Sequence, residues 1–175
     1  MVKMRGKKEL VDSLVELIEA TGMDDIVMVE VGSYAGESAS IFCSTGKVKS
    51  LTCIDPWKSG YDEKDIASSS DFTQVEEEFG KVIDKYPTII RKFKGVLADF
   101  VDRSPDFRPD LVYIDACHTY EGCKEDIANA LKLNPKVISG HDYCEGWRGV
   151  KKAVDEQFGH PDRVFGDGSW MVVRL

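Results

Sequence analysis

The feature that most constrains the fold of this chain is a series of short apolar runs that alternate with helical patterns. Runs of this length that stay apolar throughout are typical of strands buried on both faces of a parallel sheet. They cover Ile26 to Val31, Val48 to Ile54, Ile89 to Phe93, Asp110 to Ile114 and Val137 to Ser139. Between them apolar residues recur at spacings of three and four, which predicts helices. The alternation predicts a Rossmann-like, doubly wound α/β sheet with helices on both faces.

Two further strands are predicted near the carboxyl end of the chain. The segment Gly166-Asp167-Gly168-Ser169 has the composition of a hairpin turn. The expected sheet is therefore seven-stranded and mostly parallel, with a C-terminal antiparallel hairpin. At 175 residues the chain has the length of one domain, residues 1–175. We expect that domain to begin with a helix within residues 1–22 and to carry a possible lid loop at residues 57–70.

The amino-acid composition limits the kinds of molecule that the chain can be expected to bind. The chain has 31 acidic and 23 basic residues and a formal charge of -8, so its field repels polyanions, and nucleic acid is not expected as a substrate. The one dense basic cluster, Lys3, Arg5, Lys7 and Lys8, is expected to be a solvated leader. No apolar stretch is long enough for a signal peptide or membrane span, and five cysteines indicate reduced thiols. We expect a cytoplasmic protein with no membrane partner.

Ionisable residues follow the predicted strands. They are Glu30 with Gly32, then Asp55, then Asp99 after Val96-Leu97, then Asp115, and finally His141-Asp142. Parallel strands end at one edge of a sheet, and open α/β sheets bind ligands beyond that edge. This concentration of acids and histidines predicts a functional site there.

The loop after the first strand indicates which ligand that site holds. Gly32 and Gly36 allow a tight turn and a close approach to a ligand. Tyr34 stands where the dinucleotide fingerprint requires glycine, and Glu37 would repel a pyrophosphate at the start of the next helix. A cationic or zwitterionic ligand fits better. Asp55 follows the second strand at the position where nucleotide-binding folds place an acid for the ribose hydroxyls.

Four segments resemble a known family. They are residues 29–38 (VEVGSYAGES), 54–57 (IDPW), 110–122 (DLVYIDACHTYEG) and 139–143 (SGHDY). Together they resemble the methyltransferase 24 branch of the class I S-adenosylmethionine-dependent methyltransferases, over about Val27 to Phe158. The resemblance implies S-adenosylmethionine as the cofactor. It also implies that Asp55 binds the ribose hydroxyls and that Ala98 and Asp99 bind the adenine. Further cofactor contacts, several of them to the methionine portion, are implied for Glu30, Gly32, Ser33, Gly36 and Asp115.

The catalytic residues predicted from the sequence are His118, His141 and Asp115. Methyl transfer from a sulfonium is a direct displacement, so the protein must align the acceptor and remove its proton. A histidine suits the second task. Alternatively, these three residues and Asp142 could hold a divalent cation that orients a hydroxyl and lowers its pKa, with Asp115, His141 and Asp142 as the preferred ligands. Imidazole ligands would favour zinc or a transition metal over magnesium.

The function expected from these residues is O-methylation of a small-molecule or sugar hydroxyl by S-adenosylmethionine, in a possible homodimer. Two alternatives of other classes remain open. One is a metal-dependent hydrolase that uses the same cluster of aspartates and histidines. The other is a noncatalytic module that binds S-adenosylmethionine.

Overall fold

A seven-stranded sheet forms the centre of the molecule. The computed structural model describes residues 8–174. The strand order is β3-β2-β1-β4-β5-β7-β6, where β1 to β5 run parallel and β7 lies antiparallel to both β5 and β6. The strands are β1 (Ile26–Val31), β2 (Val48–Asp55), β3 (Ile90–Lys94), β4 (Leu111–Ile114), β5 (Val137–Gly140), β6 (Arg163–Val164) and β7 (Trp170–Val173). The predicted fold class is thereby confirmed, including the terminal hairpin.

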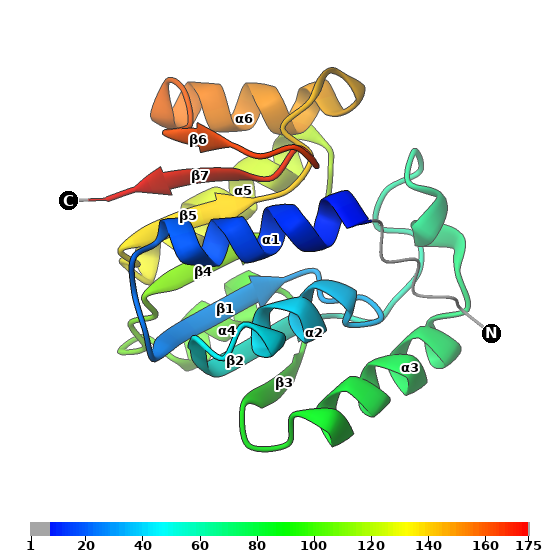
Figure 1. Cartoon of the computed structure of the whole chain (residues 1–175). Helices are drawn as coiled ribbons and strands as arrows, with labels where there is room; N and C mark the ends of the chain where they lie inside the picture. The colour runs from blue at the N-terminus through cyan, green and yellow to red at the C-terminus, as the bar shows by residue number, and fades with distance from the viewer. Residues whose placement is uncertain (1–7, 175) are drawn as a thin grey trace.

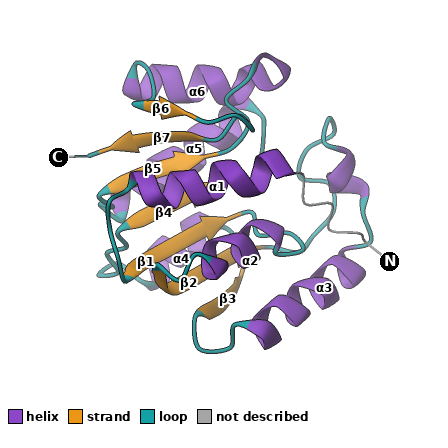
Figure 2. Ribbon diagram, viewed as in Figure 1, coloured by secondary structure: helices purple, strands orange, loops and turns teal. Residues whose placement is uncertain are grey.

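Helices cover both faces of this sheet, as Figures 1 and 2 show. One face carries α1 (Lys8–Ala20), α2 (Glu37–Ser44) and α3 (Phe72–Lys85). The other carries α4 (Leu97–Arg103), α5 (Tyr120–Lys132) and α6 (Arg148–Phe158). Two short 3-10 helices, η1 (Ile66–Ser69) and η2 (Glu145–Trp147), lie in loops. Within residues 8–174 no helix has both the length and the apolar character needed to cross a membrane.

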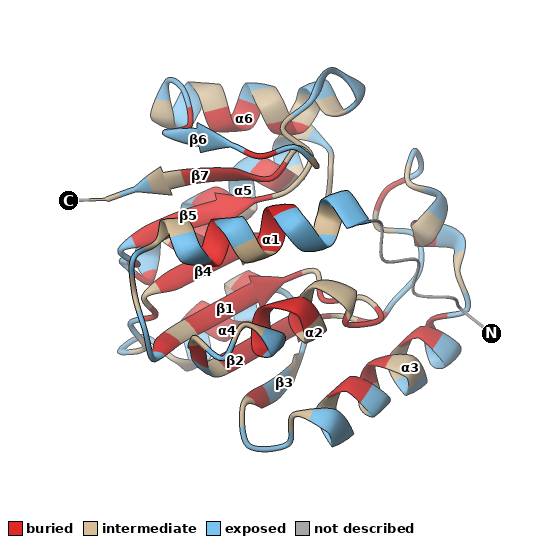
Figure 3. Ribbon diagram, viewed as in Figure 1, coloured by how far each residue is buried: buried red, intermediate tan, exposed pale blue. Residues whose placement is uncertain are grey.

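The core has two parts because side chains alternate across the strands. Met28 and Tyr113 point toward α1, α2 and α3, while Val29 and Val112 point toward α4, α5 and α6. Figure 3 shows the resulting band of buried residues along the central strands. Because both faces are covered, these strands consist mainly of apolar residues, which is the pattern that the sequence displays.

The structure corrects one element of the sequence prediction. Val96-Leu97 does not end a strand: Leu97 begins α4, and Asp99 lies exposed in the first turn of that helix. Leu97, Phe100 and Val101 are buried at the helical spacings of three and four, a signal carried by too few residues to stand out. The predicted N-terminal helix is present as α1. Residues 1–7, which include Lys3, Arg5 and Lys7 of the basic cluster, lie outside the described part of the chain.

Candidate functional site

The site lies where the strand order reverses, between β1 and β4. The chain moves from β1 outward to β2 and β3, and then returns to β4 on the other side of β1, which leaves a crevice at the carboxyl ends of these strands. Gly32, with φ 88°, follows β1. A Cβ at this position would lie 1.9 Å from the carbonyl oxygen of Asp115. Only glycine permits this approach of the two strand ends.

A cavity of about 240 Å³ occupies the crevice. Gly32, Asp55 and Asp115 line it, and all three were predicted from the sequence. Much of the rest of its wall is apolar. The other lining residues come from the strand ends, from the loop after β2, from the start of α4 and from α5: Val31, Tyr34, Ile54, Pro56, Tyr61, Gly95, Val96, Leu97, Ala98, Ala116, Cys117, Gly122, Glu125, Asp126 and Asn129.

The Asp55 carboxylate organises two loops at this edge. It accepts hydrogen bonds from the backbone N–H groups of Tyr34, at 2.9 Å, and Trp57, at 2.6 Å. Both residues have φ 45°, a conformation that is strained for large side chains and that clusters at functional sites. Burial raises the pKa of Asp55, although these N–H groups oppose the shift. Asp55 therefore lies in a fixed orientation in the cavity wall, where its remaining lone pairs can accept ligand hydroxyl groups.

Glu30, in β1, and the loop residues Ser33 and Gly36 do not line the cavity. The Glu30 carboxyl is fully buried and accepts hydrogen bonds from Ser38 Oγ at 2.6 Å and Cys53 Sγ at 3.4 Å. Burial raises its pKa to about 7. A Cβ at Gly36, which has φ 85°, would lie 2.9 Å from Phe79. These residues hold the shape of the loop, and the cavity is formed by their neighbours.

One further predicted cofactor residue, Asp99, lies apart from the cavity. Asp99 is exposed on α4 and is absent from the cavity wall, whereas Ala98 contributes to that wall. Tyr61 and the α5 residues Glu125, Asp126 and Asn129 also line the cavity, although none of them was predicted as a site residue. The residue types of these α5 positions are those of an ordinary solvent-exposed helix face. Only the spacing of Gly122, Asp126 and Asn129 indicated that these three residues lie on one side of the helix.

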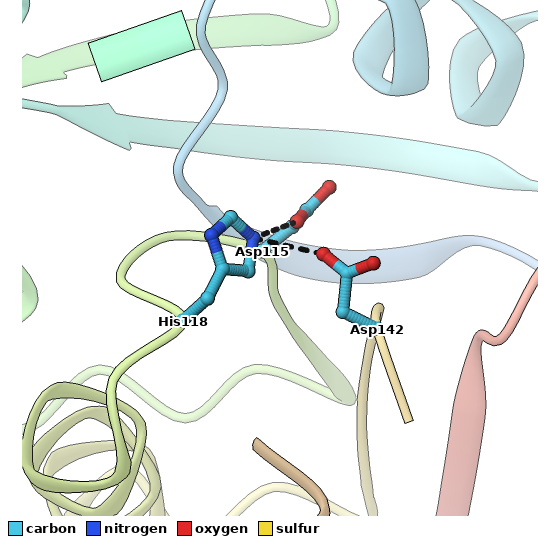
Figure 4. A group of neighbouring side chains, drawn as sticks. All are labelled: Asp115, His118 and Asp142. Carbon is cyan, nitrogen blue, oxygen red and sulfur yellow. Dashed lines mark ion pairs between the residues drawn. The ribbon is translucent and has the colours of Figure 1, made fainter. Parts of the chain in front are cut away.

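The strand ends bring His118 into a cluster of carboxylates, drawn in Figure 4. His118 Nε2 lies 2.8 Å from Asp142 and 3.6 Å from Asp115, and Nδ1 lies 3.8 Å from Asp62 and 3.7 Å from Asp65. Burial opposes protonation of this imidazole, but the carboxylates of Asp115 and Asp142 raise its pKa to about 10. The His118 side chain is therefore an imidazolium at neutral pH.

His141 forms the next part of the same cluster. Its Nδ1 lies 3.4 Å from Asp142 and 3.9 Å from Asp115, and its Nε2 lies 3.6 Å from Asp167. Burial again opposes protonation, and the surrounding carboxylates raise the pKa of His141 to about 11. Although burial has the opposite effect, the two imidazoliums hold the pKa of Asp142 well below its usual range. Acids and imidazoles thus alternate from Asp167 through His141 and Asp142 to His118.

The side chains that could hold a cation differ by one residue from the predicted set. One ligand atom each from Asp115, His118 and Asp142 lie within 4.8 Å of one another. His118 thus takes the place that the sequence analysis gave to His141. Both nitrogens of His118 are buried and have no hydrogen-bond partner among the described residues, because the close approach of Asp142 lacks hydrogen-bond geometry. Two carboxylates and an imidazole with a free nitrogen suit a divalent cation.

A groove of about 510 Å³ lies on the other side of His118. The His118 ring stacks on Trp147, with ring centroids 4.3 Å apart. Cys117 and Tyr61 line the cavity, while the residues that follow them, His118 and Asp62, line the groove. The cavity and the groove therefore adjoin at two pairs of consecutive residues, Tyr61 with Asp62 and Cys117 with His118. The remaining groove residues are Lys64, Thr119, Tyr120, Glu121, Glu145, Gly146, Arg148 and Gly149.

The loop predicted as a lid, residues 57–70, packs against Cys117 at the boundary between the cavity and the groove. Tyr61 Oη donates a hydrogen bond to Asp65 at 2.6 Å, and the Asp62 N–H donates to Ser68 Oγ at 3.1 Å. Cys117 Sγ donates to the Tyr61 carbonyl oxygen at 3.7 Å. The loop therefore contributes Tyr61 to the cavity and Asp62 to the groove, and it contains the ordered turn η1.

Comparison with known proteins identifies the class to which this fold and site belong. Three solved structures share the fold over almost the whole chain. An O-methyltransferase from Bacillus cereus in complex with S-adenosylhomocysteine has 14% identity and TM-score 0.54, over 98% of this chain and 93% of that chain. A Podospora anserina methyltransferase bound to S-adenosylhomocysteine has 12% identity and TM-score 0.63, over 97% and 80%. Aeropyrum pernix fibrillarin with bound S-adenosyl-L-methionine has 11% identity and TM-score 0.59, over 95% and 76%.

The family assignment comes from a match to the whole central part of the chain. The sequence model of the methyltransferase 24 family, described as a methyltransferase domain, matches residues 29–143, which is more than half of the chain. No curated protein sequence matches the chain. The chain belongs to the methyltransferase 24 family, and its fold is shared by methyltransferases solved in complex with S-adenosylhomocysteine. The predicted family is thereby confirmed.

Proposed function

We propose that this protein transfers the methyl group of S-adenosylmethionine to a hydroxyl group of a small molecule or sugar. The observation that carries the proposal is that two spaces adjoin, because consecutive residues, Tyr61 with Asp62 and Cys117 with His118, line the cavity and the groove. The cavity contains the strand-end residues expected to bind the cofactor, and the groove beside it is lined by His118. An acceptor in the groove and a cofactor in the cavity would meet at the cluster of Asp115, His118 and Asp142.

The groove has the chemistry of a polar acceptor site. Trp147 provides an aromatic surface, and Lys64, Glu121 and Arg148 provide charged donors and acceptors. Small-molecule sites commonly combine an apolar surface with a few polar groups that fix orientation. A sugar or another hydroxylated molecule matches this combination.

The reaction needs alignment and the removal of one proton. The two oxygens of Asp55 are held by backbone N–H groups, so this carboxylate would fix the ribose and thereby the direction of the methyl group. An imidazolium cannot accept a proton, and the carboxylates keep His118 and His141 in that form. Asp115, which lines the cavity and pairs with both histidines, is therefore the first acceptor for the hydroxyl proton. The histidines stabilise its charge.

A divalent cation is the second component that the cluster fits. Asp115, His118 and Asp142 would hold it, and His118 would bind it through a nitrogen that lacks a hydrogen-bond partner. Such a cation would orient the acceptor hydroxyl and lower its pKa. His118 would have to lose its proton before binding, so cation affinity should fall as the pH is lowered.

The proposal is tested by measuring release of S-adenosylhomocysteine from S-adenosylmethionine with a panel of sugars, phenols and other alcohols. Turnover on a hydroxyl acceptor is expected, and His118→Asn should lower kcat by about 100-fold, because the cluster loses the side chain that pairs with Asp115 and fixes its position. His160→Asn is the matched control. His160 stacks on Tyr143 and lines neither the cavity nor the groove, so this variant should retain full activity.

Three outcomes would contradict this proposal. Turnover that is equal in the His118→Asn and His160→Asn variants would remove His118 from catalysis. Cofactor binding without turnover on any acceptor would favour the noncatalytic module. A chelator-sensitive hydrolysis by a chain with no affinity for the cofactor would favour the hydrolase. Repeating the methyl-transfer assay after exhaustive chelation tests the cation separately, because unchanged activity would rule out its role.

A further inference from the structure

The wall of the cavity formed by α5 contains a carboxyl group that the proposed chemistry does not use. Gly95 donates a backbone hydrogen bond to the Asp55 carbonyl oxygen at 3.0 Å, so the start of α4 lies directly beyond the predicted ribose site. From there the wall continues through Val96, Leu97 and Ala98 to Asp126 on α5. A ligand whose ribose binds at Asp55 would extend its base into this part of the cavity.

Asp126 has no partner for its carboxyl group. No hydrogen bond or ion pair joins its side chain to another residue within the described part of the chain. Burial raises the pKa of Asp126 to about 7, and the charge of the neighbouring Glu125 adds to the shift. The Asp126 side chain is partly buried, and a partly desolvated carboxylate without a donor is costly. A ligand N–H group in this part of the cavity would remove that cost.

The surroundings of Asp126 fit a flat base with an exocyclic amino group. Apolar side chains of Val96, Leu97 and Ala98 line the approach. The Asn129 side chain also lines the cavity, and its Oδ1 accepts a hydrogen bond from Lys132 at 2.7 Å. The amide NH₂ of Asn129 is therefore the part left to donate to a ring nitrogen. Together, Asp126 and Asn129 offer one acceptor and one donor, which is the complement of the amino group and a ring nitrogen of adenine.

We propose that Asp126, on α5, selects adenine by accepting a hydrogen bond from its exocyclic amino group. This inference rests on the proposed function and reassigns the adenine contact that the sequence resemblance gave to Asp99. The exposed position of Asp99 and its absence from the cavity wall leave that residue without access to the base. Hypoxanthine carries a carbonyl oxygen in place of the amino group, and at a pH above the pKa of Asp126 this oxygen would face the carboxylate oxygens without a proton between them. Sites that hydrogen-bond a ligand group reject analogues that lack it.

The test compares two ligands that differ at this one group. Calorimetric titration of the full chain at about pH 8.5, where Asp126 is ionised, with S-adenosylhomocysteine and S-inosylhomocysteine should show a preference for the adenine ligand of about 100-fold. In Asp126→Asn, an amide that can donate to the carbonyl oxygen replaces the carboxyl group. The preference should therefore fall to within about threefold. Asp99→Asn is the matched control and should keep the preference of the unmodified chain.

The ratio of the two affinities is measured within each variant. A partial loss of folded protein affects both titrations equally and therefore does not change this ratio. A ratio near one in the unmodified chain would overturn the inference without any variant. It would also be overturned if Asp126→Asn kept the full preference or if Asp99→Asn lost it. If the unmodified chain bound neither ligand, the proposed function would fail and the inference with it, whereas binding without preference would overturn the inference alone.

Discussion

Single residues at this site carry charges in unusual surroundings, and Glu30 is the clearest case. It is fully buried beneath the first loop, where Ser38 and Cys53 donate to it. Because these two donors satisfy only part of its hydrogen-bonding capacity, burial dominates and raises its pKa to about 7. The pKa of an unfolded glutamate is near 4.5, so the folded state binds this proton more tightly. The contribution of Glu30 to stability therefore falls as the pH rises from about 4.5 to about 7.

Glu30→Gln is predicted to stabilise the protein at pH 8 and to leave it almost unchanged at pH 4.5. Gln cannot ionise, and its amide oxygen can still accept the hydrogen bond from Ser38. The gain should be on the order of 2 kcal/mol, which corresponds to about 4–8 °C in Tm for a domain of this size. Thermal unfolding at the two pH values checks the prediction. An equal shift at both values, or a lower Tm at pH 8, would contradict it.

The residue scale also shows how far the sequence could define the site. Asp115, His118, His141 and Asp142 were predicted together because they follow two strands that pair in the sheet. Their partners Asp62, Asp65 and Asp167 were not. Those three come from a long loop and a hairpin turn, whose position against the sheet depends on tertiary packing. His118, and not His141, belongs to the group of candidate cation ligands for a similar reason. The position of a strand end does not determine which way the side chains of the following loop point.

At the scale of elements, the loop between β1 and α2 is shaped by close packing against α3. Gly36 precedes α2 with φ 85°, and a Cβ there would lie 2.9 Å from Phe79 and 3.0 Å from Val82 on α3. From the sequence, Gly36 was expected to contact the cofactor. In the structure its contacts are with the hydrophobic core, so its missing side chain lets α3 pack against the loop.

Gly36→Ala is predicted to lower the free energy of unfolding by about 2–4 kcal/mol, because strain from the left-handed backbone adds to overpacking against α3. Gly60→Ala is the matched control. Gly60 has φ 82° and nothing lies within 4 Å of its Cβ position, so only the backbone strain of about 1–2 kcal/mol applies. Urea unfolding of the two variants measures the difference. Equal losses would show that α3 does not press against this loop.

Element boundaries were predictable wherever an apolar pattern or a cap marked them. The Asp71 side chain accepts a hydrogen bond from the Thr73 N–H at 3.0 Å and caps α3 as expected. The short helix α4 was missed because seven residues give the helical period little more than one repeat. That omission placed Asp99 at a strand end, whereas its contact with adenine was implied separately by the family resemblance.

At the scale of the whole molecule, the strand order explains why the cavity exists. The chain extends outward from β1 in one direction and from β4 in the other, so the connections after these two strands separate and leave a crevice at their carboxyl ends. Such an order follows from the alternation of strands and helices together with right-handed crossovers. The fold class was therefore predictable from the sequence, whereas the depth of the cavity and its α5 wall depend on packing between α4 and α5.

The central claim is that this cavity binds S-adenosylmethionine with its ribose at Asp55. Calorimetric titration with S-adenosylhomocysteine tests the claim most directly, because binding does not depend on knowing the acceptor. The unmodified chain should bind one equivalent, and Asp55→Ala should bind about 30-fold or more weakly, since two hydroxyl groups lose a charged acceptor. Asp106→Ala, which changes an exposed carboxylate outside the cavity wall, should bind as the unmodified chain does. A folded, unmodified chain that gives no binding heat with either S-adenosylhomocysteine or S-adenosylmethionine would contradict the claim.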